Sequence, residues 1–199
     1  MKSQIKRSMK FSFTIAVITF VLAAIFTIVS SSILSDVIWF VGLLIVLVIV
    51  SIGVLFDMLG IASTAASEQP FHAMAAEKVH GAKEAVIIIR NADKFASFCN
   101  DVIGDISGIV SGTATAIVVL QIADIFGQSE GSTAQITLSV VLTSIVAAIT
   151  VGGKAIGKYA AINASTNIIF FAGKTVSLIE RKLKIKILPK NEKQTNKIK

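Results

Sequence analysis

The sequence predicts an all-α membrane protein with four transmembrane helices and amphipathic juxtamembrane helices. Hydrophobic residues make up 54% of the 199 residues and charged residues only 16%. The mean hydropathy is +0.80, a value that a soluble domain with a polar exterior does not sustain. The apolar residues gather in runs close to the roughly 20 residues that a helix needs to cross about 30 Å of hydrocarbon. All Lys and Arg residues lie outside these runs.

The first predicted span covers residues 11–35 and the second residues 37–59, so that little more than Asp36 separates them and they form a tight hairpin. The third span covers residues 95–126 and the fourth residues 133–151, with the pair Gly152-Gly153 marking its end. Helices are expected because they satisfy their own backbone groups in lipid. A signal peptide is the competing interpretation of the first run, but its apolar core should be about 7 to 15 residues long.

The basic residues predict the orientation of the spans. Four precede the first span, four lie between residues 78 and 94, and the other eleven lie between residues 154 and 199. If the N-terminus is cytoplasmic, four spans place all 19 of them inside, whereas the outer loops contain Asp36 and Glu130 and no basic residue. We therefore expect a multi-pass protein of the plasma membrane with both termini cytoplasmic.

The C-terminal tail is strongly basic. Residues 181–199 carry eight basic residues and one acid, a net charge of +7 that equals the charge of the whole chain. Such a segment beside the inner leaflet is attracted to anionic lipid at about 1 kcal/mol per basic residue. We expect amphipathic helices at residues 68–90 and 163–184 along the inner surface. Nucleic acid is a weaker interpretation, since no aromatic residue is interleaved with these charges.

The domain organisation follows from these segments. Residues 1–35 form a basic N-terminus and a first helix, residues 36–183 the main transmembrane domain, and residues 184–199 the basic tail. The single Cys99 excludes an internal disulfide. His72 and His80 are too few for a zinc or haem signature. Neither a nucleophile-base pair nor a phosphate-binding glycine loop is present, so we do not expect an enzyme.

Polar residues that could bind a metal ion surround the inner loop between the second and third spans. Ser63 and Ser67 follow the second span, and Asn100, Asp101 and Asp105 open the third. Hydroxyl, amide and carboxylate oxygens are the ligands that Mg²⁺ or Ca²⁺ takes, and an acid in or near a membrane span is a functional candidate by default. These five residues form the predicted metal site, with Mg²⁺ as its ion and no other cofactor.

Structural interpretations of the same residues remain open. Ser67 is placed to cap a short surface helix that contains His72. Gly104, Gly108 and Gly112 recur every four residues, a period that permits close approach to another helix. That helix could belong to the same chain or to a second copy in a homodimer.

Three short segments, in their order and spacing, carry a resemblance to a known family. They are Gly-Ile-Ala-Ser-Thr-Ala at residues 60–65, Arg-Asn-Ala-Asp-Lys-Phe at residues 90–95 followed by Asn100-Asp101, and Gly-Lys-Ala-Ile-Gly-Lys at residues 153–158. From about residue 37 to residue 183 the layout resembles the transmembrane domain of the CNNM/CorC (CorB-like) magnesium and cobalt transporters. The resemblance implies three spans after an added N-terminal helix, a dimer, and Mg²⁺ bound by oxygens of Ser63, Ser67 and Asn100.

The sequence also departs from the family pattern. Ser63 and Lys154 stand where the family has glutamates, Gly157 stands where it has a proline, and its tandem CBS domains have no counterpart in these residues. Two function classes therefore remain open: a divalent-cation transporter or an auxiliary of one, and a non-transporting scaffold that binds lipid or a partner protein. Lys154 discriminates between them, since a lysine within about 4 Å opposes a divalent ion unless it pairs with an aspartate.

Overall fold

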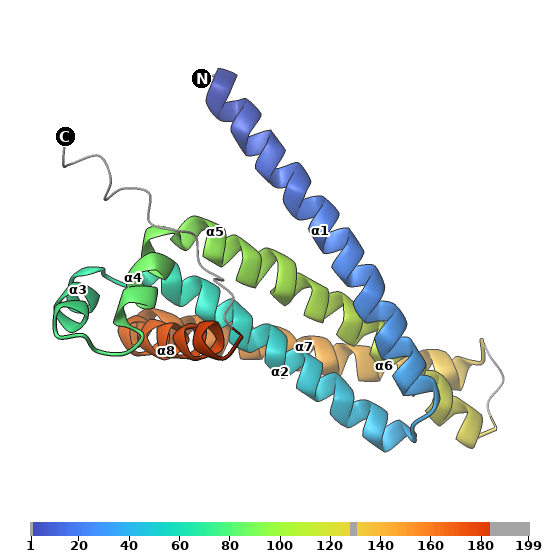
Figure 1. Cartoon of the computed structure of the whole chain (residues 1–199). Helices are drawn as coiled ribbons and strands as arrows, with labels where there is room; N and C mark the ends of the chain where they lie inside the picture. Colours follow the sequence, from blue (N-terminus) through green and yellow to red (C-terminus); the bar gives the residue numbers. More distant parts are fainter. Residues whose placement is uncertain (1, 128–130, 184–199) are drawn as a thin grey trace. The chain divides into compact units, whose positions relative to one another are not determined.

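The computed structural model describes residues 2–127 and 131–183, and it is helical almost throughout these residues, with no strand among them (Figure 1). The prediction of an all-α membrane protein is therefore confirmed. The basic tail at residues 184–199 and Glu130 of the outer loop lie outside the described residues.

Within the part of the chain that the structure describes, four helical segments are long and apolar enough to cross a membrane, as predicted. They are formed by α1 (Lys2–Ser35), by α2 (Trp39–Ala65), by the continuous run of α5 (Ala92–Ser97), η1 (Phe98–Gly104) and α6 (Asp105–Ile125), and by α7 (Thr133–Asn163). The middle part of the third segment, η1, is a π-helix. Each of its residues turns the chain less than an α-helical residue does.

The helix of the fourth span does not end at Gly152-Gly153 as predicted, because α7 continues to Asn163. A glycine inside a helix costs only about 1 kcal/mol relative to alanine, and packing on both sides of the pair offsets that cost. At Gly153 the missing side chain lets Val54 of α2 approach, since a Cβ there would lie 3.1 Å from a Val54 methyl group. Further along, Ala161 is fully buried.

The chain divides into two compact units, which we describe separately. Unit 1 comprises Met1–Asp57 and Phe98–Gly157, and unit 2 comprises Met58–Ser97 and Lys158–Lys199 as far as they are described. In unit 1 the helices α1, α2, α6 and α7 contribute buried aliphatic side chains such as Leu34, Val46, Val118 and Val146 to one core. The α1–α2 hairpin is fixed to α6 by Gln121, whose Nε2 donates to the carbonyl oxygens of Leu34 (2.7 Å) and Val37 (3.1 Å).

Unit 2 contains three short helices beside the ends of α2 and α7. They are α3 (Gln69–Ala76), α4 (Ala82–Arg90) and α8 (Ser165–Leu183), and they pack around Phe71, Ile88 and Ile169, each fully buried. The apolar face of α4 lies against α8, where Gly173 and Gly81 meet so closely that neither position has room for a side chain. The observed α8 agrees with the helix predicted at residues 163–184.

The single helix predicted at residues 68–90 is in fact two helices. Lys78 and Gly81 adopt positive φ values of 58° and 87° and turn the chain between α3 and α4. The predicted capping by Ser67 is also wrong, because the N-cap residue of α3 is Glu68 and its side chain makes no capping hydrogen bond. Pro70 in the first turn lacks an N–H group, so one of the donors that a cap would satisfy is missing.

Candidate functional site

The five predicted metal ligands fall into both units. Ser63 and Ser67 belong to unit 2, whereas Asn100, Asp101 and Asp105 belong to unit 1. The Ser63 side chain is fully buried, and its Oγ donates to the Gly60 carbonyl oxygen at 2.7 Å. This hydrogen bond directs the hydroxyl back along α2. Ser67 is exposed just beyond the end of α2.

The three polar residues of the third span have different surroundings. Asn100 lies in η1, and its Oδ1 atom is buried without a hydrogen-bond partner among the described residues. Asp101 and Asp105 are both exposed, and neither carboxylate forms a hydrogen bond or ion pair with a described residue. The structure therefore does not gather these three side chains into a closed cluster. Asn100 alone offers a buried, unused oxygen.

The principal charged contact of unit 1 was not predicted as a pair. Lys154 Nζ of α7 lies 3.1 Å from Asp57 Oδ2 of α2, and the two side chains are only 30% and 16% exposed. Gly104 of η1 makes room for this carboxylate, since a Cβ there would lie 2.5 Å from Asp57 Oδ1. Among the aspartates near this end of the spans, Asp57 is the partner of Lys154, and neither Asp101 nor Asp105 forms this pair. We call Asp57, Lys154 and Gly104 the polar cluster.

The polar cluster lies at one end of the membrane-spanning part. Counted from Trp39, Ile125 and Thr133, the roughly 20 residues that cross the hydrocarbon reach about residues 58, 106 and 152. Asp57, Asp105 and Lys154 all fall within two residues of these limits. These charges are therefore expected at the edge of the hydrocarbon layer, where charged groups cost far less than at its centre.

The remaining ionisable residues do not form an obvious metal centre. Among the described residues, no group of three or more His, Cys, Asp and Glu side chains is placed to hold an ion. In unit 2, His72 Nε2 lies 2.7 Å from Glu68 Oε1, and Arg90 binds the same carboxylate. His80 Nε2 lies 3.0 Å from Arg181 Nη1. Each histidine therefore has a guanidinium neighbour, which opposes a bound cation.

The carboxyl group of Glu68 responds to these neighbours. Partial desolvation acts to raise its pKa, but the hydrogen bonds and charges of Arg90 and His72 outweigh that effect and hold the pKa below its ordinary value of 4.5. Glu68 thus stays ionised and joins the start of α3 to the last residue of α4.

The outward face of α8 combines apolar and basic side chains. Phe171 and Leu178, two turns apart, are 71% and 57% exposed. Lys174, Arg181 and Lys182 are exposed on the same helix. Apolar side chains flanked by basic ones are typical of a helix that lies at a membrane surface.

Comparison with protein-family models, curated proteins and solved structures finds no match. The CNNM/CorC resemblance therefore rests on the short motifs of the sequence. Function must be argued from the polar cluster, from Asn100 and from the outward face of α8.

Proposed function

We propose that this multi-pass membrane protein is a non-transporting scaffold that binds lipid or a partner protein at one membrane surface. The ion pair between Lys154 and Asp57 is the observation that supports this proposal most directly. An ammonium group 3.1 Å from the carboxylate neutralises it, so that Asp57 attracts a metal ion less strongly. A divalent ion about 4 Å from an unpaired Lys154 would be opposed by roughly 8 kcal/mol at an effective dielectric constant of 20. Asp57 offsets much of that opposition as long as the pair is intact, so the pair disfavours an ion mainly by engaging the carboxylate.

The outward face of α8 is the proposed binding surface. Phe171 and Leu178 would enter the interfacial region of the bilayer, while Lys174, Arg181 and Lys182 would contact anionic head groups. A nitroxide spin label attached to Leu178→Cys, in a chain whose Cys99 is replaced, should be accessible to oxygen in anionic vesicles. The same label should be protected from a water-soluble paramagnetic relaxation agent. A nitroxide at Lys83→Cys, an exposed site on α4, serves as the matched control. Equal exposure of both labels to water would contradict lipid binding by this face.

Divalent-cation transport, or an auxiliary role in it, is the second candidate, and Asn100 favours it. A buried amide oxygen without a partner is a ready ligand for Mg²⁺, and π-helical turns are frequent at functional sites. In this alternative, Lys154 leaves Asp57 when the ion binds. Membership of the CNNM/CorC family, with Mg²⁺ as cargo, belongs to this second proposal.

Magnesium flux into proteoliposomes distinguishes the two candidates. The scaffold proposal expects the natural chain, Asn100→Ala and Asp101→Asn to give no more flux than protein-free vesicles. Transport predicts clear flux for the natural chain and at least a tenfold loss in Asn100→Ala. Lys154→Met tests whether the ion pair blocks a pathway, and Lys158→Met, which alters an exposed lysine one turn along α7, is its control. Flux that appears only in Lys154→Met would support a blocked transporter and contradict the scaffold.

A further inference from the structure

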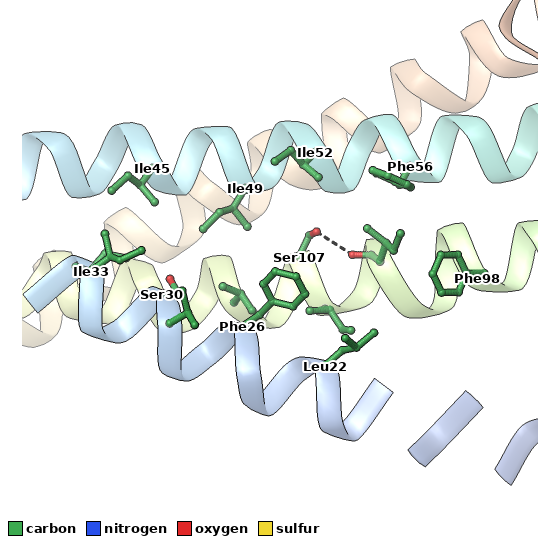
Figure 2. Close-up of a pocket in the computed structure, with 15 residues that line it drawn as sticks. Leu22, Phe26, Ser30, Ile33, Ile45, Ile49, Ile52, Phe56, Phe98 and Ser107 are labelled. Carbon is green, nitrogen blue, oxygen red and sulfur yellow. Dashed lines mark hydrogen bonds between the residues drawn. The ribbon is translucent and has the colours of Figure 1, made fainter. Parts of the chain in front are cut away.

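A long apolar cavity lies inside unit 1, between α1, α2 and the η1–α6 segment (Figure 2). Its volume is about 630 Å³, within the range of roughly 300 to 1,000 Å³ that is usual for small-molecule sites. Leu22 and Phe26 of α1, Ile49 of α2, and Phe98 and Val110 of the third span are among its lining residues.

The side chains that line the cavity are almost entirely apolar. Its two hydroxyl groups belong to Ser30 and Ser107. Ser107 Oγ already donates to the Ile103 carbonyl oxygen at 2.8 Å, the bond drawn in Figure 2. Ser30 Oγ is buried without a partner among the described residues. An occupant is therefore recognised by apolar contact, with no charged group and at most one hydrogen bond.

The dimensions of the cavity indicate the shape of that occupant. The lining extends along α1 from Leu22 to Leu34, about 18 Å of helix, which is close to the roughly 15 Å depth of one leaflet. A volume of 630 Å³ spread over that length makes a long, narrow slot. An extended hydrocarbon chain fits along it, whereas a helix with side chains, about 10–12 Å in diameter, would enter it only with individual side chains.

The position of α1 gives the cavity a closed end and an open end. The tight α1–α2 turn, held by Gln121, closes it near Leu34. Toward its N-terminus, α1 diverges from α2 (Figure 1), while Ile15 and Leu22 of α1 still pack against the η1–α6 segment. Lipid surrounds these membrane-spanning helices, so the diverging side opens onto acyl chains, and an apolar hollow left empty would forfeit contacts along its whole length.

We propose that the cavity between α1, α2 and η1–α6 is a binding site for one acyl chain of a membrane phospholipid, which enters beside the diverging half of α1. This site is separate from the outward face of α8 and from the polar cluster. It would exist in a scaffold and in a transporter alike.

The test uses the full chain in phosphatidylcholine vesicles that contain a phospholipid with a diazirine in the middle of one acyl chain. The protein is extracted, washed extensively in detergent to remove loosely associated lipid, irradiated, and mapped by mass spectrometry. We expect about one retained lipid per chain and adducts on lining residues such as Phe26 and Ile49. Few adducts are expected at Ile145, which is exposed on α7 and outside the cavity. No retained lipid, or equal labelling at Ile145, would overturn the proposal in the natural chain.

Three single-residue variants test whether the retained lipid occupies the cavity. Ile49→Trp should fill the slot and lower retained lipid at least fivefold, whereas Ile145→Trp should leave it unchanged. Ser30→Ala should also leave retention unchanged, because a hydrocarbon chain cannot bond that hydroxyl. If Ser30→Ala alone abolishes retention, the occupant is polar and the assignment to an acyl chain is wrong. A parallel experiment with a diazirine fatty acid identifies the source of the chain from the mass of the adduct. Retention of the phospholipid supports the proposal, and retention of the fatty acid alone would overturn the assignment to a phospholipid.

Discussion

At the level of single side chains, Asp57 is held by groups from two other elements of unit 1. Lys154 of α7 supplies the countercharge, and Gly104 of η1 leaves the space that the carboxylate fills. Both contacts are made by the Asp57 side chain, which is only 16% exposed. The removal of either neighbour therefore has consequences that can be measured.

Lys154→Met should destabilise the protein because it leaves the largely buried Asp57 carboxylate without a countercharge. We expect a loss of about 2 kcal/mol, less than the roughly 3–5 kcal/mol typical of a fully buried pair, measured as the free energy of unfolding in mixed micelles. Lys158→Met should change it little, since Lys158 is exposed. The double variant Asp57→Asn/Lys154→Met should recover much of the loss. Equal effects of the two lysine variants would contradict a stabilising ion pair.

Gly104→Ala and Gly108→Ala form a second matched pair. A Cβ at position 104 would lie 2.5 Å from Asp57 Oδ1, whereas at position 108 no described atom lies within 4 Å. Gly104→Ala should therefore lower the melting temperature by several degrees. Gly108→Ala should leave it unchanged or raise it slightly, because alanine is favoured over glycine in a helix by up to about 1 kcal/mol. A lower melting temperature for Gly108→Ala in detergent would show that this face is covered.

The sequence could identify the residue types of the candidate site but not their pairing. The acids near the membrane edge stand out in an apolar chain, so Asp101 and Asp105 could be predicted as candidates, whereas Asp57 was not among the predicted site residues. Which of them meets Lys154 depends on how α2 and α7 are rotated, and no local pattern encodes that rotation. Counting 20 residues from the far end of each span would have placed Asp57 and Lys154 at about the same depth in the membrane.

Among the elements, the short helices α3 and α4 are joined by a charge contact with a predictable pH dependence. The pKa of Glu68 is lower in the folded protein than its ordinary value of 4.5. Its contribution to stability is therefore present above pH 4.5 and is lost as the pH falls below that value. Hydrogen exchange in α3, corrected for the intrinsic rate, should be faster at pH 3.5 than at pH 6 in the natural chain. Glu68→Gln should weaken this difference, and Glu77→Gln, an exposed acid at the end of α3, should preserve it.

The exposed glycines of α6 predict self-association. No described atom lies within 4 Å of a Cβ at Gly108 or Gly112, so within one chain they do not make the close helix contact that their spacing permits. If a second copy packs there, Gly112→Cys in a Cys99-free chain should form a disulfide-linked dimer in membranes. Leu47→Cys, exposed on α2, should crosslink much less. Absence of a dimer along this face, and along the exposed face of α7, would contradict the homodimer.

For the whole molecule, the charge pattern predicts which side of the membrane each loop occupies. In a Cys99-free chain, Glu130→Cys should react with an impermeant maleimide added outside intact cells. Lys190→Cys should react only after the membrane is permeabilised, because the distribution of the 19 basic residues predicts that both termini are inside. External labelling at position 190 would overturn this topology.

The number, type and approximate place of the long helices follow from hydropathy alone, because each span must bury its backbone polar groups in lipid. The predictions that were wrong concern features that depend on how the helices pack. Helix α7 passes Gly152-Gly153 because α2 packs there, and residues 68–90 break where Lys78 and Gly81 turn the chain. The cavity beside α1 depends on how helices diverge, and periodicity carries no information about that.

During synthesis, Asp57 emerges from the ribosome well before its countercharge. Roughly 100 residues separate it from Lys154, which at about 5 to 20 residues per second corresponds to roughly 5 to 20 seconds. Throughout that interval the carboxylate has no lysine beside it and retains its water shell at the membrane edge. The last transmembrane helix to be made therefore completes the polar cluster, so a nascent chain truncated before α7 should present an unpaired Asp57 carboxylate to water.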